Sequence, residues 1–336
     1  MRKSKLLLQG LLVGLLSILF LVVWGPTAQG AEKKIVVGYS AIEGGVAPLW
    51  TGHAVGIFPK YGLETELVYI GSGTQATQVL LSGSIPLMSM GGAMINANLA
   101  GADTVTIAGS TNVLVFELMT QPGIQNAQQL KGGTIAISRF GSVSDTAARL
   151  AVRQLGLDPN KDVTILQVGG TTSRIAALKA GKVQGAMVVP PLTYEGQKQG
   201  FKTLVDLAAQ GIDFPMMGIG TTRSYIAKEP NTVRAFMKGY VEGIAYFKGH
   251  RDQGIQIIAK NFKLDDLDLV AKMYDLFADR IIPRKPYASI KGFETFIGFL
   301  AEKDPRAKNL KAAEVVDNRF VEELDKSGFI DQLYKK

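Results

Sequence analysis

The feature that most constrains the fold of this chain is a regular alternation of short apolar segments with helical segments. β-rich apolar runs occupy Lys34–Ser40, Leu63–Ile70 and Ile85–Met90, and each ends in small residues that lead into a helical pattern. Strand, helix and strand at this spacing predict βαβ units, in which helices cover the faces of a parallel sheet. The same order returns in the strands expected at 134–138, 163–168 and 184–189.

The two sets of segments match at one sequence offset. Ser138 follows Ser40 by 98 residues (138 − 40), Gly169 follows Gly71 by the same number (169 − 71), and three further pairs share the offset. This period is far too long for a solenoid repeat and indicates two similar lobes. Unrelated βαβ units also share the order strand, glycine turn and helix, so duplication and coincidence both stay open at this point.

These patterns predict an α/β fold of two lobes, each a mostly parallel sheet flanked by helices. With 336 residues, the chain is too long for one ordinary core, which agrees with two domains. Lobe one is expected to hold residues 33–118 and 219–336, and lobe two residues 121–213. The chain is expected to cross between the lobes twice, near Met119–Gln121 and near Phe214–Gly218.

The N-terminus has the organisation of an export signal. Three basic residues within the first five positions precede the apolar run Leu6–Val23, a helix-breaking Trp24–Pro26 and the small residues Ala28 and Gly30. This order predicts a signal peptide over residues 1–30 that is cleaved after Gly30, which leaves a soluble periplasmic protein. The alternative is an uncleaved membrane anchor, because the apolar run approaches spanning length.

The composition excludes several classes of site. The chain has no cysteine, which rules out disulfides, thiolate metal ligands, a cysteine nucleophile and a lipidated N-terminal cysteine. Its two histidines, His53 and His250, lie far apart in sequence, so we expect no metal site and no cofactor. Without residues 1–30 the net charge falls from +8 to +5 (37 − 3 − 29), and the dispersed basic residues argue against a nucleic-acid partner. No Gly-x-Ser-x-Gly, P-loop or His-Glu-x-x-His motif occurs, and we predict neither catalytic residues nor enzyme activity.

Five turns rich in glycine, serine and threonine follow the predicted strands. In open α/β sheets, ligands bind beyond the carboxyl ends of the strands. Glycine lets the backbone approach a ligand closely, and the free N–H groups of a helix N-terminus bind anions. We therefore predict ligand contacts at Ser40, Ala41, Gly44, Gly45, Ser72, Gly73, Thr74, Gly91, Gly92, Arg139, Phe140, Gly141, Ser142, Ser144, Thr171 and Thr172.

Each of these residues also has a purely structural interpretation. The hydroxyl residues are typical N-caps, and the glycines are typical of turns. Glu43 either pairs with a ligand amine or is a solvated loop acid, and the solvated acid is the favoured interpretation. Arg174 lies in the first turn of its helix, where the dipole disfavours a cation. It is expected either to bind a ligand anion or, in the favoured interpretation, to form a surface salt bridge.

Longer motifs carry a family resemblance. They are IVVGYS, PLWTGHAVGIFPKYGLETELVYIGSGTQATQVLLSGSIPLMSMGGA, TIAISRFGSVSDTAARLAVRQLGLDPNKDVTILQVGG, RIAALKAGKVQGAMVVPP and KEPNTVRAFMKGYVEGIAYF. Over about residues 33–330 the chain resembles the exported substrate-binding proteins of ABC importers, in the subgroup for aliphatic sulfonates, taurine, nitrate and thiamine precursors. The resemblance implies the type II periplasmic-binding-protein fold with two hinge crossings.

The resemblance also implies a function. The protein is expected to be a monomer that captures a small, anionic solute between its lobes and delivers it to an ABC permease in the inner membrane. Family contacts map onto the turns named above and add Pro190 and Pro191. Many relatives have Trp-Asp-Pro or a similar polar group where this chain has Val189-Pro190-Pro191, which leaves recognition of an amine open.

Two alternatives to an exported carrier remain at this point. One is a membrane-anchored sensory binding protein, in which residues 6–23 stay uncleaved. The other is an enzyme of the pyrimidine-synthase type on the same lobes. Enzymes of that type use a Cys-rich segment and a suitably placed histidine and lysine. The absence of cysteine from this chain therefore disfavours the enzyme.

Overall fold

Two five-stranded sheets form the framework of the protein, and the computed structural model describes residues 32–335. The strand order is β2-β1-β3-β10-β4 in the first sheet and β7-β6-β8-β5-β9 in the second. The predicted signal peptide, residues 1–30, and its cleavage site lie outside the described residues. Within residues 32–335, no helix is both long enough and apolar enough to span a membrane.

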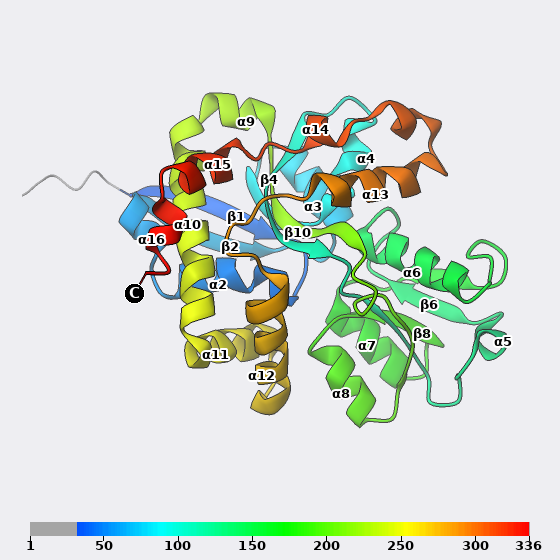
Figure 1. The fold of residues 1–336 in the computed structure, drawn as a ribbon. Coiled ribbons are helices and arrows are strands. Elements are labelled where there is room, and N and C mark those ends of the chain that lie inside the picture. The colour runs from blue at the N-terminus through cyan, green and yellow to red at the C-terminus, as the bar shows by residue number, and fades with distance from the viewer. Residues whose placement is uncertain (1–31, 336) are drawn as a thin grey trace, which may run out of the picture. The chain divides into compact units, whose positions relative to one another are not determined.

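Lobe one consists of the first sheet and the helices packed on it (Figure 1). Its strands are β1 (Lys33–Tyr39), β2 (Leu63–Tyr69), β3 (Leu87–Met90), β4 (Thr104–Val113) and β10 (Asp213–Thr222). Its α-helices are α2 (Ala47–Ala54), α3 (Gly73–Leu81), α4 (Ile95–Asn98), α9 (Arg223–Lys228), α10 (Pro230–Gly249), α11 (Arg251–Phe262), α12 (Leu267–Asp275), α13 (Ile290–Ala301), α14 (Ala312–Val315), α15 (Arg319–Lys326) and α16 (Phe329–Gln332). Short 3-10 turns are η1 (Gly44–Val46), η2 (Phe58–Tyr61), η3 (Gly92–Met94) and η5 (Pro305–Asn309), and η4 (Leu276–Ile281) is a π-helical turn.

Lobe two consists of the second sheet and four helices of the described chain. Its strands are β5 (Glu117–Thr120), β6 (Thr134–Ile137), β7 (Thr164–Gln167), β8 (Gly185–Val188) and β9 (Lys202–Asp206). Its helices are α5 (Ala127–Leu130), α6 (Val143–Gln154), α7 (Thr171–Lys179) and α8 (Leu192–Lys198). Figure 1 shows α6 on one face of the sheet and α7 and α8 on the other.

Each sheet consists mostly of strands that run in one direction, as the sequence predicts, and includes one strand that runs against them. β1 pairs with β3 in parallel, and β6 pairs in parallel with β7 and β8. In contrast, β10 runs antiparallel to β3 and β4, and β5 runs antiparallel to β8 and β9. The physical reason is the path of the chain. Because β5 and β10 each follow a passage from one sheet to the other, they start at the sheet edge where the parallel strands end.

The chain passes between the sheets at residues 114–116 and again at 207–212. Both passages lie a few residues before the expected positions near Met119–Gln121 and Phe214–Gly218. The sequence analysis did not identify the short strand β5, which already belongs to the second sheet at Glu117. The sheets therefore assign residues 117–206 to lobe two, and residues 33–113 and 213–335 to lobe one.

The sequence offset of 98 residues is reproduced by the elements themselves. β1, β2, β3 and α3 end at residues 39, 69, 90 and 81, and β6, β7, β8 and α7 end at residues 137, 167, 188 and 179. Each pair differs by 98, and the corresponding strands occupy the same order in their sheets. The two lobes are therefore built on one repeated βαβαβ plan.

The sequence pattern also predicts a helix over 48–58 and helical stretches over 266–281 and 317–334, and all three are divided in the structure. The helix expected at 48–58 is α2 followed by η2, and the stretch at 266–281 is α12 followed by η4. The stretch at 317–334 contains α15 and α16, which Gly328 separates with a positive φ of 75°. These divisions leave the predicted order of the elements unchanged.

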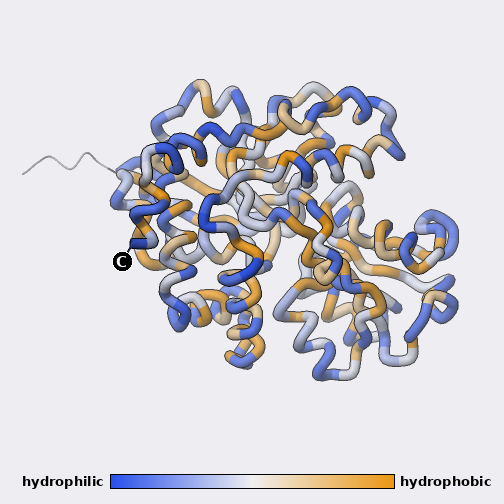
Figure 2. The backbone as a smooth tube through the Cα atoms, in the orientation of Figure 1, coloured by the Kyte–Doolittle hydropathy of each residue, from blue (hydrophilic) through white to orange (hydrophobic). Residues whose placement is uncertain are grey.

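The interiors of both lobes are apolar, and the hydrophilic residues gather on the outer loops (Figure 2). Val37 and Leu87 are fully buried in lobe one, as are Ile135 and Met187 in lobe two. These residues lie on central strands, so both faces of each sheet are covered by packed helices. This burial supplies the main driving force for folding.

Helix α10 fastens the C-terminal part of the chain to lobe one. A Cβ atom at Gly239 would lie 2.5 Å from the Phe58 ring, and one at Gly243 would lie 2.7 Å from the Pro48 carbonyl oxygen. The Phe58 ring also stacks on Phe236, with 5.4 Å between the ring centroids. Close packing of α10 on α2 and η2 therefore depends on the two glycines.

The central pairing of β10 with β4 predicts a contrast between two glycine-to-alanine changes. A Cβ at Gly218 would lie 2.2 Å from the Ala108 backbone oxygen, whereas one at Gly298 on α13 would meet nothing within 4 Å. Gly218→Ala should lower the free energy of unfolding by about 1–3 kcal/mol. Gly298→Ala should raise it by about 0.5–1 kcal/mol through the higher helix propensity of alanine. Denaturant titration measures both values, and effects of the same sign would contradict the packing described.

Candidate functional site

A small cavity lies where the two lobes meet, at the carboxyl ends of β1, β3, β6 and β8. Its volume is about 50 Å³, enough for a few water-sized groups. The lining residues are Ser40, Ala41, Glu43, Gly71, Gly73, Gly91, Phe116, Ser138, Ser142, Val143, Ser144, Gly170, Thr171, Arg174, Val189, Met216 and Met217. They come from both lobes, so a molecule in the cavity contacts both at once.

Three helices begin at this cavity. Gly73, Val143 and Thr171 are the first residues of α3, α6 and α7, and all three line it. The first N–H groups of a helix have no partner within the helix, and the N-terminus carries a partial positive charge. The convergence of the three termini therefore makes the cavity favourable for a negative group.

A cluster of three serine hydroxyls stands at the start of α6. The Oγ atoms of Ser138, Ser142 and Ser144 are 2.9 Å from one another, and all three side chains are buried. The Ser138 backbone N–H donates to Ser144 Oγ, and the Asp145 N–H donates to Ser142 Oγ, which caps the helix. Each hydroxyl can turn its hydrogen from a neighbouring serine to a bound acceptor. The cluster thus supplies donors that are already positioned.

Arg174 contributes a buried positive charge to the lining. Its side chain is 2% exposed, and its guanidinium donates to the carbonyl oxygens of Met187 (2.7 Å) and Gly169 (3.0 Å) and to Thr171 Oγ1 (2.7 Å). Burial lowers the pKa of Arg174 to about 10, so the group stays protonated at neutral pH. It forms no ion pair within residues 32–335. The favoured interpretation as a surface salt bridge is therefore wrong, because α7 directs this side chain into the junction of the lobes.

Glu43 contributes a buried carboxyl group from the loop between β1 and η1. The residue is 1% exposed, and neither carboxylate oxygen has a hydrogen-bond partner in the described chain. Burial raises the pKa of Glu43 to about 7, and the nearby Gly45 N–H offsets this only in part. The favoured interpretation as a solvated loop acid is wrong. The loop turns inward because Gly45 packs against Thr111, whose Oγ1 would lie 2.3 Å from a Cβ at that position.

Seven of the residues predicted to contact ligand do line the cavity: Ser40, Ala41, Gly73, Gly91, Ser142, Ser144 and Thr171. The others do not: Gly44, Gly45, Ser72, Thr74, Gly92, Arg139, Phe140, Gly141, Thr172, Pro190 and Pro191. Arg139 and Thr172 are exposed, and the Phe140 side chain is 48% exposed. Ser72 is buried as the N-cap of α3, where its Oγ accepts from the Gln75 N–H.

Other predicted residues shape the surroundings of the cavity. A Cβ at Gly44 would lie 2.4 Å from the Phe277 ring, and one at Gly92 would lie 2.5 Å from Pro215 Cγ. These glycines therefore allow close packing within lobe one. Pro190–Pro191 lie beyond Val189, at the start of α8, and are buried.

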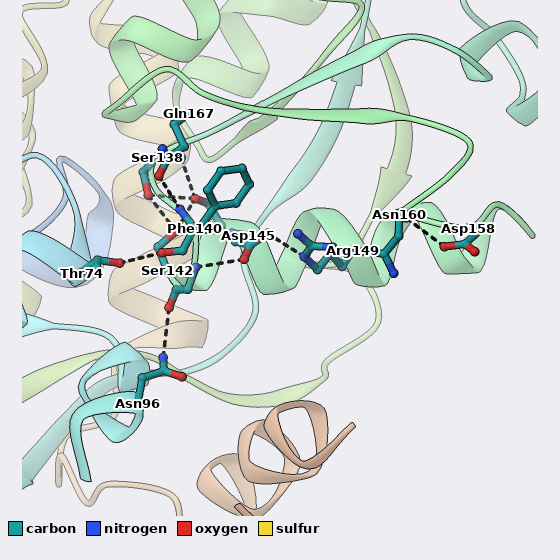
Figure 3. Close-up of polar contacts among 12 residues, drawn as sticks. Thr74, Asn96, Ser138, Phe140, Ser142, Asp145, Arg149, Asp158, Asn160 and Gln167 are labelled. Carbon is teal, nitrogen blue, oxygen red and sulfur yellow. Dashed lines mark hydrogen bonds and ion pairs between the residues drawn. The ribbon is translucent and has the colours of Figure 1, made fainter. Parts of the chain in front are cut away.

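Hydrogen bonds between the lobes involve several of the remaining predicted residues (Figure 3). Thr74 Oγ1 donates to the Phe140 carbonyl oxygen at 3.1 Å, and Asn96 Nδ2 donates to the Gly141 carbonyl oxygen at 3.2 Å. Thr74 and Asn96 belong to lobe one, whereas Phe140 and Gly141 belong to the loop before α6 in lobe two. These predicted residues thus hold the lobes together beside the cavity rather than lining it.

Two ion pairs also join the lobes. Arg153 of α6 contacts Glu302 at 2.5 Å, and Lys198 of α8 contacts Asp266 at 2.7 Å. Both pairs are exposed, so each contributes little stability on its own. Together with the hydrogen bonds, these ion pairs hold the two lobes in a closed arrangement.

Sequence analysis missed ten lining residues: Glu43, Gly71, Phe116, Ser138, Val143, Gly170, Arg174, Val189, Met216 and Met217. Six of these directly adjoin a predicted residue, so extending each turn by one residue would have found them. Phe116, Met216 and Met217 lie at the passages between the sheets and carry no motif. Glu43 and Arg174 were weighed as ligand contacts, but their sequence context does not reveal their burial.

Comparison with known proteins places the chain in a family. A model of the NMT1-like family matches residues 28–261. The riboflavin-binding protein RibY of Chloroflexus aurantiacus is 25% identical over 240 residues, which cover 69% of this chain and 67% of RibY. The family match includes most of both lobes.

Solved structures share the architecture at low identity. The periplasmic aliphatic sulphonate binding protein SsuA from Escherichia coli is 24% identical, with a TM-score of 0.57 over 72% of this chain and 83% of that one. The periplasmic nitrate-binding protein NrtA from Synechocystis PCC 6803 is 16% identical, with a TM-score of 0.70 over 88% of each chain. The predicted two-lobed fold is confirmed by these structures. Since the family model matches well over half of the chain, the protein belongs to the NMT1-like family and has the fold of the periplasmic binding proteins.

Proposed function

We propose that the protein captures one small solute between its two lobes and delivers it to the permease of an ABC importer. The observation that carries this proposal is the cavity whose lining comes from both lobes. A solute that contacts both lobes binds the closed arrangement more tightly than an open one, so it shifts the population towards closure. A closed and an open form then present different surfaces to a membrane partner.

The comparisons support a binding role. The relatives and structures named above are binding proteins for riboflavin, a sulfonate and nitrate. The lining holds hydroxyls, backbone N–H groups, one guanidinium and one carboxyl group, which together suit recognition of a polar solute. We therefore favour a carrier over an enzyme of the pyrimidine-synthase type, and we place the mature protein in the periplasm as a monomer after cleavage of residues 1–30.

The ligand carries an anionic group in this proposal. Arg174 presents a positive charge without an ion-pair partner in the described chain, and three helix N-termini surround it. Charge-assisted hydrogen bonds to such donors are stronger than neutral ones. A sulfonate, a carboxylate or nitrate fits these donors, and the cavity volume of about 50 Å³ favours a small molecule or a small head group.

Closure on binding can be measured with the protein purified after export. A thermal-shift screen of alkanesulfonates, nitrate and small carboxylates should identify a compound that raises the melting temperature, because a ligand of the native state stabilises it. Small-angle scattering with that compound should show a smaller radius of gyration than without it. Identical scattering curves in the presence and absence of a tight ligand would contradict the proposed capture mechanism.

A matched pair of arginine variants tests the anion site. Arg174→Lys keeps the charge but loses the fixed fork of donors, and it should weaken binding of the best anion from the screen by roughly tenfold or more. Arg139→Lys is the control, because Arg139 is exposed and does not line the cavity. Titration calorimetry measures both affinities, and melting temperatures report whether each variant is folded. Unchanged affinity in a folded Arg174→Lys protein would place the anion elsewhere.

A further inference from the structure

The cavity is lined by two buried, ionisable side chains of opposite sign that do not pair with each other. Glu43 comes from lobe one and Arg174 from lobe two, and both are almost fully buried. Neither forms an ion pair within residues 32–335. Buried charges in folded proteins are normally paired, because removing a lone charge from water is costly. Two unpaired ionisable groups in one small cavity therefore indicate that a bound molecule supplies the opposite charge to each of them.

From these two side chains we infer that the ligand is bipolar: it places an anionic group on Arg174 and a positively charged nitrogen on Glu43. This inference rests on the proposed function, because it assumes that a solute binds in the cavity. It adds Glu43 as the residue that selects the second end of the solute. A molecule of this kind links the lobes by charge, with one end on each.

Among residues 32–335, the groups found beside Glu43 are hydroxyls and include no cation. The hydroxyls of Ser110 and Thr111 on β4 and of Tyr240 on α10 are buried without a partner in the described chain. Thr111 packs beside the same glycine as Glu43. Burial raises the pKa of Tyr240, and the negative charge of Glu43 adds to this rise, so Tyr240 also lies close to Glu43. Tyr240 is the one ionisable side chain among these neighbours, and it is uncharged at neutral pH. Within residues 32–335, the Glu43 carboxylate thus has no positive partner among these neighbours.

Arg174 is fixed more firmly than Glu43. Three of its N–H groups donate within lobe two, and its guanidinium carbon lies 5.7 Å from the centre of the Phe116 ring, another lining residue. A guanidinium has five N–H donors, so two remain for a ligand. The anionic end of the solute therefore has a preformed partner, and the nitrogen end must lie towards the β1–η1 loop.

The two ends predict opposite responses to pH. A bipolar ligand binds the ionised form of Glu43, so its affinity should rise as pH increases through about 7, the pKa of this side chain. A ligand with only a negative charge is repelled by the ionised carboxylate and prefers the protonated form. Its affinity should therefore fall over the same range. The sign of the pH dependence distinguishes the two kinds of ligand.

The state of Glu43 in the ligand-free protein has its own test. Its pKa is about 7 in the native protein against 4.5 as the ordinary value. Between these values the native state retains a proton that the unfolded chain has released. The stability associated with Glu43 is therefore fully present below about pH 4.5 and is lost as pH rises through about 7. Glu43→Gln, which stays neutral, should lack this loss, so its melting temperature relative to wild type should increase with pH. Parallel melting-temperature profiles for the two proteins would contradict a buried, unpaired Glu43.

Calorimetry with matched small molecules tests the inference directly. 2-Aminoethanesulfonate and β-alanine are the bipolar probes, and ethanesulfonate and propionate are the same molecules without the nitrogen. The bipolar probes should bind at least tenfold more tightly, with affinity rising through about pH 7. Glu43→Gln should abolish this preference, and it should also remove the fall in ethanesulfonate affinity as pH rises through about 7. Its melting temperature confirms that the variant is folded.

Two results would overturn the inference while leaving the proposed function standing. One is equal or tighter binding of the nitrogen-free anions, with affinity that falls as pH rises. The other is closure in scattering experiments on a different solute when neither bipolar probe binds. If instead no compound of any class produces closure, the proposed function itself fails.

Discussion

The structure depends on the direction in which the strands of its two sheets run. β1, β3, β6 and β8 all end where the lobes meet, so the helices that follow them begin there. β5 and β10 start at the same place, because the chain enters each sheet from the other lobe. This arrangement brings the N-termini of α3, α6 and α7 to one cavity and makes it electrostatically positive before any side chain is considered.

The polar side chains at this junction have fewer partners within the protein than their burial calls for, unlike the well-packed side chains of the core. Central strands such as β3 and β6 are covered on both faces, and their packing stabilises each lobe by itself. At the junction, Glu43 and Arg174 are buried without charged partners, and Arg174 stands at a helix N-terminus that disfavours a cation. Buried, unpaired charges lower the stability of the protein unless a ligand supplies groups of opposite charge. Packing thus forms two rigid lobes, and the unsatisfied polar groups favour a solute between them.

The sequence predicted the fold well because the fold is periodic. Apolar strands, glycine turns and helices alternate along the chain, and the offset of 98 residues appears unchanged in the ends of eight elements. The short strands β5 and β9 were not predicted, because their sequences carry little periodic signal. The predicted passages between the lobes therefore lie a few residues too late in the chain. The mixed character of the sheets also follows from the path of the chain rather than from any local pattern.

The site was predicted only in part, because a turn does not reveal which of its side chains points inward. Thr171 and Thr172 are adjacent and chemically alike, yet one lines the cavity and the other faces solvent. Glu43 is buried because neighbouring glycines allow its loop to pack against Thr111 and Phe277, a contact between segments distant in sequence. The inward direction of each turn is set by such packing.

The most direct test of the account is a crystal structure of the protein with its tightest-binding solute. The account predicts solute density between the lobes, within hydrogen-bond distance of Arg174 and of the start of α6 on one side and of the β1–η1 loop on the other. Density that contacts a single lobe, or that lies outside this cavity, would contradict a site shared by both lobes.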